Sequence, residues 1–212
     1  MNRGLFITFE GPDGSGKSTQ IKNLKNKLEK KGLETVLTRE PGGTAISENI
    51  RKMILDVKNS EMDSLTEALL YAAARAQHVA QIIMPALEAD KTVICDRFMD
   101  SSIAYQGYGR KLGDQVRIIN EYAVRGLSPD ITFLLLLEPS IGKGRIKRAY
   151  DRLELEKNEF HDDVYKGYLE LAKRNPERII MIDATKSILE IEKEIELHLE
   201  QLIQNKREIY DL

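Results

Sequence analysis

The stretch from Gly11 to Thr19 constrains this chain more than any other part of its sequence. It reads Gly-Pro-Asp-Gly-Ser-Gly-Lys-Ser-Thr and lies between an apolar run, residues 5–9, and a helix-like segment. Gly11 and Gly16, with four residues between them and with Lys17 and Ser18 directly after, match the phosphate-binding loop in spacing and in context. A glycine-rich turn without a ligand is the alternative, but strand, loop and helix follow in the order that phosphate binding requires.

The residue types of this loop indicate how it would bind a nucleotide. Glycines let backbone N–H groups close around phosphate oxygens, and the helix that begins near Lys17 directs its positive dipole end at them. Lys17 would reach the outer phosphates of ATP, and the Ser18 hydroxyl would bind Mg²⁺. The residues predicted to bind ATP are Gly11, Pro12, Asp13, Gly14, Ser15, Gly16, Lys17, Ser18 and Thr19.

The composition excludes several other classes of protein. A formal net charge of −2 over 212 residues gives no basic footprint for nucleic acid. The single cysteine, Cys95, excludes an internal disulfide and, with three scattered histidines, a zinc cluster. The N-terminus has no signal-peptide layout, and the longest apolar run, residues 131–137, is too short to span a bilayer. We therefore expect a cytoplasmic protein with no membrane and no nucleic-acid partner.

Short apolar runs alternate with longer helical patterns along the whole chain, which predicts an α/β fold in one domain, residues 1–212. The apolar runs lack polar alternation, as strands buried on both faces of a parallel sheet do. The five predicted strands are Leu5–Phe9, Glu34–Thr38, Thr92–Cys95, Ile131–Leu137 and Arg178–Ile182. The predicted helices cover about 17–31, 45–56, 64–89, 114–126, 140–149, 156–174 and 186–206.

Charged pairs follow two of the predicted strands, where open α/β sheets bind ligands. Arg39 and Glu40 precede a Pro-Gly-Gly turn, and they could face a substrate phosphate or hydrogen-bond the loop. Asp96 and Arg97 end the third strand. An acidic residue at this place usually lies on the Mg²⁺ side of a phosphate-loop enzyme, and the fork of Arg97 suits phosphate, although such pairs also occur as structural ion pairs.

The longest predicted helix carries a polar face beside its apolar one. Tyr71, Arg75 and His78 share this face, where an aromatic ring can stack on a base and an arginine can bind a phosphate, or the ring can simply pack against a solvated arginine. The apolar face, predicted to contact the core, contains Leu65, Leu69, Ala72, Ala76, Val79 and Ile83. Residues 100–109 form a polar turn or the start of a helix, well placed for base recognition at the end of the third strand.

A cluster of basic residues follows the fourth strand. Residues 143–152 include Lys143, Arg145, Arg148 and Arg152. Such a run is usually a solvated helix face, but transfer of a phosphoryl group needs mobile cations that neutralise charge and exclude water. We therefore predict a lid at about residues 143–154.

Taken together, these segments resemble the bacterial thymidylate kinases. The motifs that carry the resemblance are the phosphate loop, Arg39-Glu40-Pro41-Gly42-Gly43-Thr44, Tyr71-Ala72-Ala73-Ala74-Arg75-Ala76-Gln77-His78, Asp96-Arg97-Phe98 and Ser101-Ser102-Ile103-Ala104-Tyr105-Gln106-Gly107. They cover nearly the whole chain in the expected order. The resemblance implies a phosphate-loop nucleoside-monophosphate kinase fold, a five-stranded parallel sheet flanked by helices. It also implies a homodimer that uses ATP and Mg²⁺ to convert dTMP to dTDP for dTTP synthesis.

The resemblance also implies roles for individual residues. Tyr71 would stack on thymine, Arg75 and Gln106 would contact the base, and Tyr105 would exclude a ribose 2′-hydroxyl. Ser18 and Asp96 would lie at Mg²⁺. The remaining residues expected at the dTMP site are Arg39, Glu40, Arg51, Arg97, Ser101 and Ser102, and the expected catalytic set is Asp13, Lys17, Arg97, Arg148 and Arg152.

Some positions depart from the family pattern, and some alternatives stay open. Position 14 is glycine where some relatives carry an arginine, so the catalytic cation would come from the lid, with Arg145 as a further candidate. Leu136 replaces an acidic residue of many relatives, and Ala74 replaces an Asp before the helix arginine. Another nucleoside-monophosphate kinase, a nucleotide-dependent switch and a nucleic-acid motor are the competing hypotheses.

Overall fold

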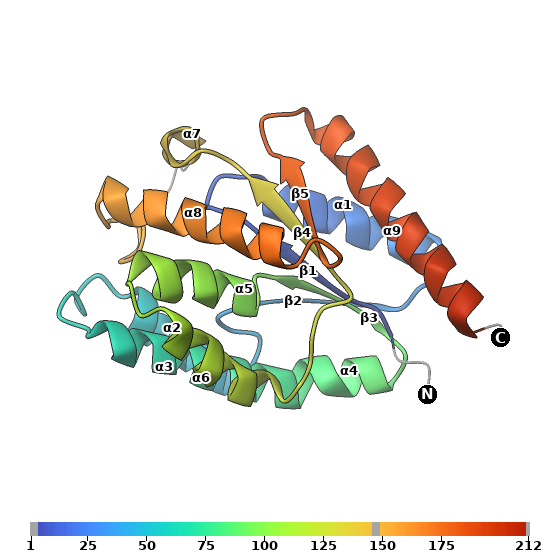
Figure 1. Cartoon of the computed structure of the whole chain (residues 1–212). Coiled ribbons are helices and arrows are strands. Elements are labelled where there is room, and N and C mark those ends of the chain that lie inside the picture. The colour runs from blue at the N-terminus through green and yellow to red at the C-terminus, as the bar shows by residue number, and fades with distance from the viewer. Residues whose placement is uncertain (1–3, 146–148, 211–212) are drawn as a thin grey trace.

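A five-stranded parallel sheet with helices on both faces forms the centre of the computed structural model (Figure 1). The structure describes residues 4–145 and 149–210. The strand order is β2-β3-β1-β4-β5, and each predicted strand is confirmed with its ends shifted by no more than one residue. The strands are β1 (Phe6–Glu10), β2 (Thr35–Arg39), β3 (Thr92–Asp96), β4 (Ile131–Leu136) and β5 (Ile179–Asp183).

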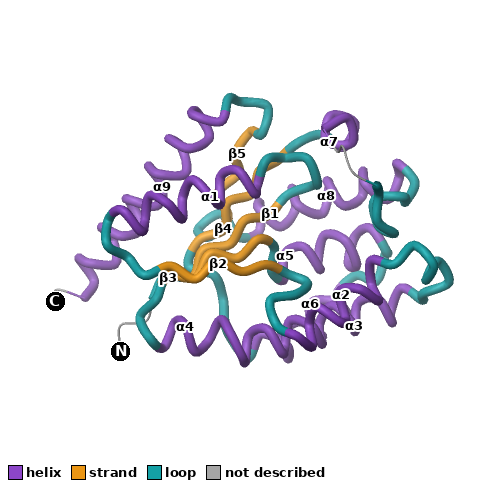
Figure 2. The backbone as a smooth tube through the Cα atoms, turned by 180° about the vertical axis from the view of Figure 1, so that it is seen from behind, coloured by secondary structure: helices purple, strands orange, loops and turns teal. Residues whose placement is uncertain are grey.

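The helices cover both faces of this sheet, as Figure 2 shows from behind. Helices α1 and α9 lie on one side of the strands, and the group from α2 to α6 lies on the other. Their bounds are α1 (Lys17–Lys30), α2 (Ala45–Leu55), α3 (Ser64–His78), α4 (Met84–Glu88), α5 (Met99–Ser102), α6 (Asp114–Val124), α7 (Pro139–Arg145), α8 (Asn158–Arg174) and α9 (Ile188–Tyr210).

Two short π-helical segments join some of these helices. Segment η1 (Val79–Ile83) connects α3 to α4, so the long helix expected over 64–89 forms as one helical run with a π turn in its middle. Segment η2 (Ile103–Gly109) continues α5. Residues 99–109 are therefore helical, and π turns often occur at functional sites.

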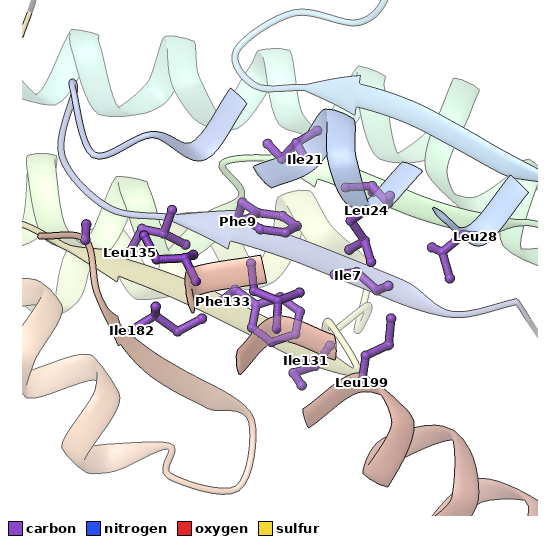
Figure 3. Close-up of a cluster of buried hydrophobic side chains, with 14 of the residues drawn as sticks. Ile7, Phe9, Ile21, Leu24, Leu28, Ile131, Phe133, Leu135, Ile182 and Leu199 are labelled. Atoms are coloured by element: carbon purple, nitrogen blue, oxygen red, sulfur yellow. The ribbon is translucent and has the colours of Figure 1, made fainter. Parts of the chain in front are cut away.

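The main hydrophobic core lies between the sheet and the helices α1 and α9. Ile7 and Phe9 from β1 and Phe133 from β4 are fully buried there, and the rings of Phe9 and Phe133 lie 5.4 Å apart (Figure 3). Side chains of this size each stabilise the fold by about 1.5–3 kcal/mol when buried. On the opposite face, Phe6 and Cys95 pack in a second cluster, so Cys95 is the core residue that its apolar strand predicted.

The predicted core face of α3 is partly wrong. Leu65 and Leu69 are 40% and 50% exposed, although Ala72 is buried as expected. The helix instead buries Glu67 and Arg75, whose charges meet partners from other elements. Apolar periodicity alone cannot reveal such a rotation, because it treats every charged residue as exposed.

Candidate functional site

The predicted functional residues gather at the carboxyl edge of the sheet, where the three strands β2, β3 and β1 lie side by side. Thr38 pairs in register with Cys95, and Phe9 with Asp96, so the segments after these strands leave the sheet together. The neighbouring segments are the phosphate loop, Arg39–Glu40 and Asp96–Arg97. This arrangement follows from parallel strands, whose carboxyl ends all point the same way.

The phosphate loop wraps the side chain of Lys17. The Lys17 ammonium donates to the carbonyl oxygens of Gly11 and Pro12, each at 2.9 Å. Burial, and then the charge of Arg97, lower the pKa of Lys17 to about 8. Gly16 has φ 90° and precedes the first residue of α1 without a side-chain cap. The loop thus presents a cation and an uncapped helix N-terminus, which together suit an anionic phosphate chain.

A cavity of about 440 Å³ opens over this loop. Five cationic side chains, each from a different segment of the chain, line this cavity together with the loop. The lining residues are Asp13, Gly14, Gly16, Lys17, Ser18, Thr19, Arg39, Glu40, Arg51, Asp96, Arg97 and Arg145. A polar cavity with this many cations fits several phosphate groups.

Asp96 contributes a carboxylate to the same cavity, which Ser18 also lines. Its Oδ1 atom is buried and has no hydrogen-bond partner within residues 4–145 and 149–210. In that same part of the chain, no group of three or more His, Cys, Asp or Glu side chains could hold a metal alone. A Mg²⁺ ion that binds mainly through phosphate oxygens and water needs only one or two such protein ligands, so Ser18 and Asp96 fit it.

Arg97 joins the phosphate loop to the rest of the site. Its NH2 atom donates to Asp13 Oδ1 at 2.9 Å, and its guanidinium lies 5.3 Å from the centre of the Tyr105 ring. The residue has φ 68°, a backbone conformation that costs a bulky side chain about 1–2 kcal/mol. The surrounding contacts therefore hold this arginine in a strained position, as is common for residues at functional sites.

Glu10 lies beneath Arg97 at the end of β1 and is a residue that the sequence analysis missed. Its carboxyl group accepts from the Phe98 and Ser101 N–H groups at 2.7 and 3.2 Å, from the Ser101 hydroxyl at 2.5 Å and from the Tyr168 hydroxyl at 3.1 Å. Burial, and then the charge of Asp100, raise the pKa of Glu10 to about 7. Ser101 and Tyr168 also accept from Arg97 NH1, so this network fixes the guanidinium from below.

A second cavity, about 90 Å³ in volume, adjoins the first. The two cavities share four lining residues, Asp13, Glu40, Arg51 and Arg97. The other residues of the second cavity are Pro41, Leu55, Tyr71, Arg75, Ser101, Ser102, Tyr105, Gln106, Asp151 and Leu153. An apolar ring, a buried arginine and an amide thus lie on the far side of the shared charged residues.

Arg75 is the most extensively bound of these residues and is 2% exposed. Its Nε atom donates to Glu40 Oε2 at 2.7 Å, NH1 to Ser102 Oγ at 2.9 Å and to Asn120, and NH2 to the Phe98 carbonyl at 2.9 Å. The predicted face of α3 is confirmed, because Tyr71 and Arg75 line the same cavity. His78, on the same face, pairs through Nδ1 with the other Glu40 oxygen.

Glu40 therefore acts mainly on the protein itself, as an acceptor between Arg75 and His78. Arg39 and Arg51 both donate to the carbonyl oxygen of Pro41 at 3.0 Å. Arg39 is also paired with Glu48. Both arginines still line the phosphate cavity, so a nucleotide phosphate could compete for their donors.

Tyr105 and Gln106 come from η2. Tyr105 is 9% exposed, and burial raises the pKa of its phenol, as it does for Tyr71. Gln106 is 1% exposed, and its Nε2 atom donates to Glu67 Oε1 at 2.8 Å. Both side chains reach the cavity because η2 packs between α3 and α8.

The structure describes two of the arginines predicted to belong to a lid, and their surroundings differ. Arg145 lines the phosphate cavity and donates to the carbonyl oxygens of Gly14 and Ala184 at 3.4 and 3.3 Å. Arg152 is buried, with donors to the Ile54 carbonyl at 2.8 Å and to Glu67 at 2.5 Å. Arg148 lies outside the described residues.

Several residues of the site had no clear sign in the sequence. Asn120 and Tyr168 are distant in sequence from the motifs, Glu67 lies just before one of them, and all three reach their partners only through folding. Two signals were available: Glu10 directly follows an apolar strand, and Glu67 lies four residues before Tyr71 on the same helix.

Comparison with known proteins identifies the family. The family model described as thymidylate kinase matches residues 9–195. A thymidylate kinase of Geobacillus sp. (strain WCH70) is 50% identical over 194 residues, which cover 89% of this chain and 92% of that protein. One from Latilactobacillus sakei is 53% identical over 191 residues, covering 87% and 89%. The chain belongs to the thymidylate kinase family.

A solved structure agrees with this family assignment. The crystal structure of thymidylate kinase from Ehrlichia chaffeensis superposes with a TM-score of 0.77 and 37% identity, covering 93% of this chain and 99% of that one. The expected nucleoside-monophosphate kinase fold is thereby confirmed. In the described part of this thymidylate kinase family member, no helix is long and apolar enough to cross a membrane.

Proposed function

We propose that the two adjoining cavities hold the two substrates of this family's reaction, with phosphoryl transfer at the residues they share. The chain is a nucleoside-monophosphate kinase that transfers the γ-phosphoryl group of ATP to dTMP, giving dTDP and ADP. The observation that supports the proposed arrangement best is that Asp13 and Arg97 line both cavities and are bound to each other.

ATP would bind over the phosphate loop. Backbone N–H groups of residues 11–19 and the Lys17 ammonium would contact the phosphates, which would replace the two carbonyl oxygens that Lys17 now contacts. Ser18 and Asp96 would hold Mg²⁺, an assignment supported by the unpartnered Asp96 oxygen in the described structure. The ion, when bound, would neutralise charge on the transferring phosphoryl group.

The nucleoside part of dTMP would occupy the smaller cavity. Tyr71 would stack on the base, Arg75 and Gln106 would contact its polar edge, and Tyr105 would contact the sugar at its 2′ carbon. Ser101 and Ser102 would complete the pocket mainly by holding other residues, because their hydroxyls bind Glu10 and Arg75. Glu40 would likewise act by holding Arg75.

The phosphate of dTMP would lie between the two cavities, near Arg39, Arg51 and Arg97. Catalysis would rest on positioning and charge neutralisation, since phosphoryl transfer needs no strong base. Asp13 would orient Arg97 on the acceptor side. Among the described lid arginines, Arg145 is the better candidate for a cation at the γ-phosphate, because Arg152 is occupied by Glu67. Arg148 and Arg152 stay candidates if the lid moves when ATP binds.

The remaining proposals concern the whole molecule. We propose one kinase domain, residues 1–212, located in the cytoplasm, that works as a homodimer. Helices α2, α3 and α6 expose apolar side chains that a second copy could cover: Ile46, Met53, Leu65, Leu69, Ile118 and Tyr122. Light scattering of the parent and of Leu69→Glu tests this, with a dimer expected for the parent and a smaller species for the variant.

The acceptor preference is tested with a coupled assay for ADP formation. Purified protein is mixed with ATP, Mg²⁺ and one of dTMP, UMP, CMP, AMP or GMP. The expected result is a clear preference for dTMP and negligible turnover without an acceptor. A preference for another acceptor, or binding of ATP without dTMP-dependent turnover, would overturn the proposed assignment of the smaller cavity.

A further inference from the structure

The base end of the smaller cavity contains one hydrogen-bonding atom that no protein group uses. Gln106 is 1% exposed, and its carbonyl oxygen Oε1 is buried without a hydrogen-bond partner in the described part of the chain. Leaving a buried acceptor unpaired costs about 1–3 kcal/mol. Gln106 is one of the residues that line the smaller cavity, so a ligand bound there could supply the missing donor.

Glu67 determines which end of the Gln106 amide is left over. Glu67 is fully buried on α3 and accepts from Gln106 Nε2 at 2.8 Å, from Arg110 at 3.2 and 3.0 Å and from Arg152 at 2.5 Å. A carboxylate that forms salt bridges with two arginines offers its oxygens as hydrogen-bond acceptors. The amide group that faces it must therefore be the NH₂ end, which leaves the oxygen for the ligand.

Arg75 provides the complementary group in the same cavity. A guanidinium has five N–H bonds. Four of them are used: Nε for Glu40, both on NH1 for Ser102 and Asn120, and one on NH2 for Phe98. Within residues 4–145 and 149–210, no hydrogen bond uses the second N–H of NH2. The cavity thus offers one donor from Arg75 and one acceptor from Gln106.

This pattern distinguishes two classes of pyrimidine. A ring with a keto group at C4 offers an acceptor, O4, beside a donor, N3–H. A ring with an amino group at C4 offers the reverse, a donor N4–H beside the acceptor N3. We propose that Glu67 is a specificity-determining positioning residue, which holds the Gln106 amide so that the cavity accepts a keto pyrimidine and rejects an amino pyrimidine. This inference rests on the proposed role of Gln106 and Arg75 as base contacts.

The variant Glu67→Gln tests the inference with almost no change in volume. A neutral amide can accept or donate, so it no longer dictates the orientation of Gln106. The ratio of kcat/KM for dTMP to kcat/KM for dCMP should fall by at least about tenfold, the effect of one mispaired buried group. The change should come from a higher KM for dTMP, with kcat much less affected. A ratio within twofold of the parent in a folded variant would overturn the inference.

Glu156→Gln is the matched control. Glu156 also pairs with Arg110, at 2.6 Å, but within the described residues it forms no hydrogen bond with Gln106. This variant should keep the parent ratio. Loss of discrimination here of the same size as in Glu67→Gln would mean that Arg110, not Gln106, carries the effect, and would contradict the proposal.

Two more variants separate failure of the inference from failure of the proposed base contact. Gln106→Leu removes the amide; an unchanged ratio in this variant would refute the base contact itself. The double variant Glu67→Gln with Gln106→Leu should discriminate no worse than Gln106→Leu alone, and a further loss would show that Glu67 acts by another route. Should Glu67→Gln not fold, Glu67→Asp remains informative, because a shorter carboxylate still only accepts and should keep the ratio.

Discussion

The contact between the phosphate loop and helix α7 can be tested with single methyl groups. A Cβ atom added at Gly14 would lie 2.5 Å from the carbonyl oxygen of Gly142 in α7, and one added at Gly142 would lie 2.6 Å from the carbonyl oxygen of Asp13. Real Cβ atoms do not approach backbone this closely, and neither obstacle is a flexible side chain. One backbone must therefore shift in either variant.

The expected magnitudes differ because the two glycines differ in conformation. Gly14 has φ 80°, so Gly14→Ala adds backbone strain of about 1–2 kcal/mol to an overlap cost of about 1–3 kcal/mol. Gly142 has no such strain and lies in a helix, where alanine gains about 1 kcal/mol over glycine. Gly14→Ala should thus lower the free energy of unfolding by about 2–5 kcal/mol, and Gly142→Ala by about 0–2 kcal/mol.

Gly32→Ala is the matched control for strain alone. Gly32 also has φ 80°, lies in the turn after α1, and has no atom within 4 Å of an added Cβ. Urea unfolding of the nucleotide-free proteins, followed by circular dichroism, should rank the loss of stability as greatest in Gly14→Ala. If Gly14→Ala and Gly32→Ala lose the same free energy, the loop and α7 are not in backbone contact, and the reasoning is refuted.

Three further predictions concern single side chains of the site. The pKa of Glu10 is raised from 4.5 to about 7 in the folded protein. Between pH 4.5 and 7 the folded protein therefore holds a proton that the unfolded chain has released. The contribution of Glu10 to the free energy of unfolding falls as pH rises through this window. The stability difference between the parent and Glu10→Gln, measured by urea unfolding at pH 5, 6, 7 and 8, should therefore change in favour of the variant as pH rises; a constant difference would contradict the assignment. Arg145→Ala should lower kcat by about 10²–10³-fold, with a smaller effect on the KM for ATP, because one preorganised charge is lost. If steady-state kinetics give a kcat near the parent value, Arg148 or Arg152 is the catalytic cation instead. Tyr105→Phe should leave kcat/KM for dTMP within about threefold of the parent value. A phenyl ring keeps the contact with the Arg97 guanidinium, and the energies of the Tyr and Phe contacts differ by less than about 1 kcal/mol. A loss above tenfold in the same assay would assign the hydroxyl a direct role.

Much of the fold could be read from local patterns. The five strands and the phosphate loop were predictable because each is specified by a short run of residues. Apolar β-branched runs are typical of buried parallel strands, and closely spaced glycines before a lysine are typical of a phosphate loop. The family resemblance then supplied the acceptor. The positions of Tyr71 and Arg75 on one face followed from helical geometry alone.

The supporting residues could not be predicted in this way. Glu67, Glu10 and Asn120 are ordinary polar residues in their local segments, and their burial depends on partners 39, 91 and 45 residues away. The same burial turned α3 so that Leu65 and Leu69 face outward. A buried charge is stable only when its partners are in place, and those partners come together only in the folded chain.

The sequence by itself therefore determined the kind of sheet, the position of the phosphate loop within it, and the residue types that meet a nucleotide. Only the tertiary structure decided how those residues are held: which end of the Gln106 amide binds Glu67, that Arg145 contacts the phosphate loop, and that Glu40 binds Arg75 and His78. The reason is physical. A phosphate loop is specified by the backbone conformations of consecutive residues, whereas the direction of a hydrogen-bonding group is specified by all the groups around it, and these are brought together by the fold.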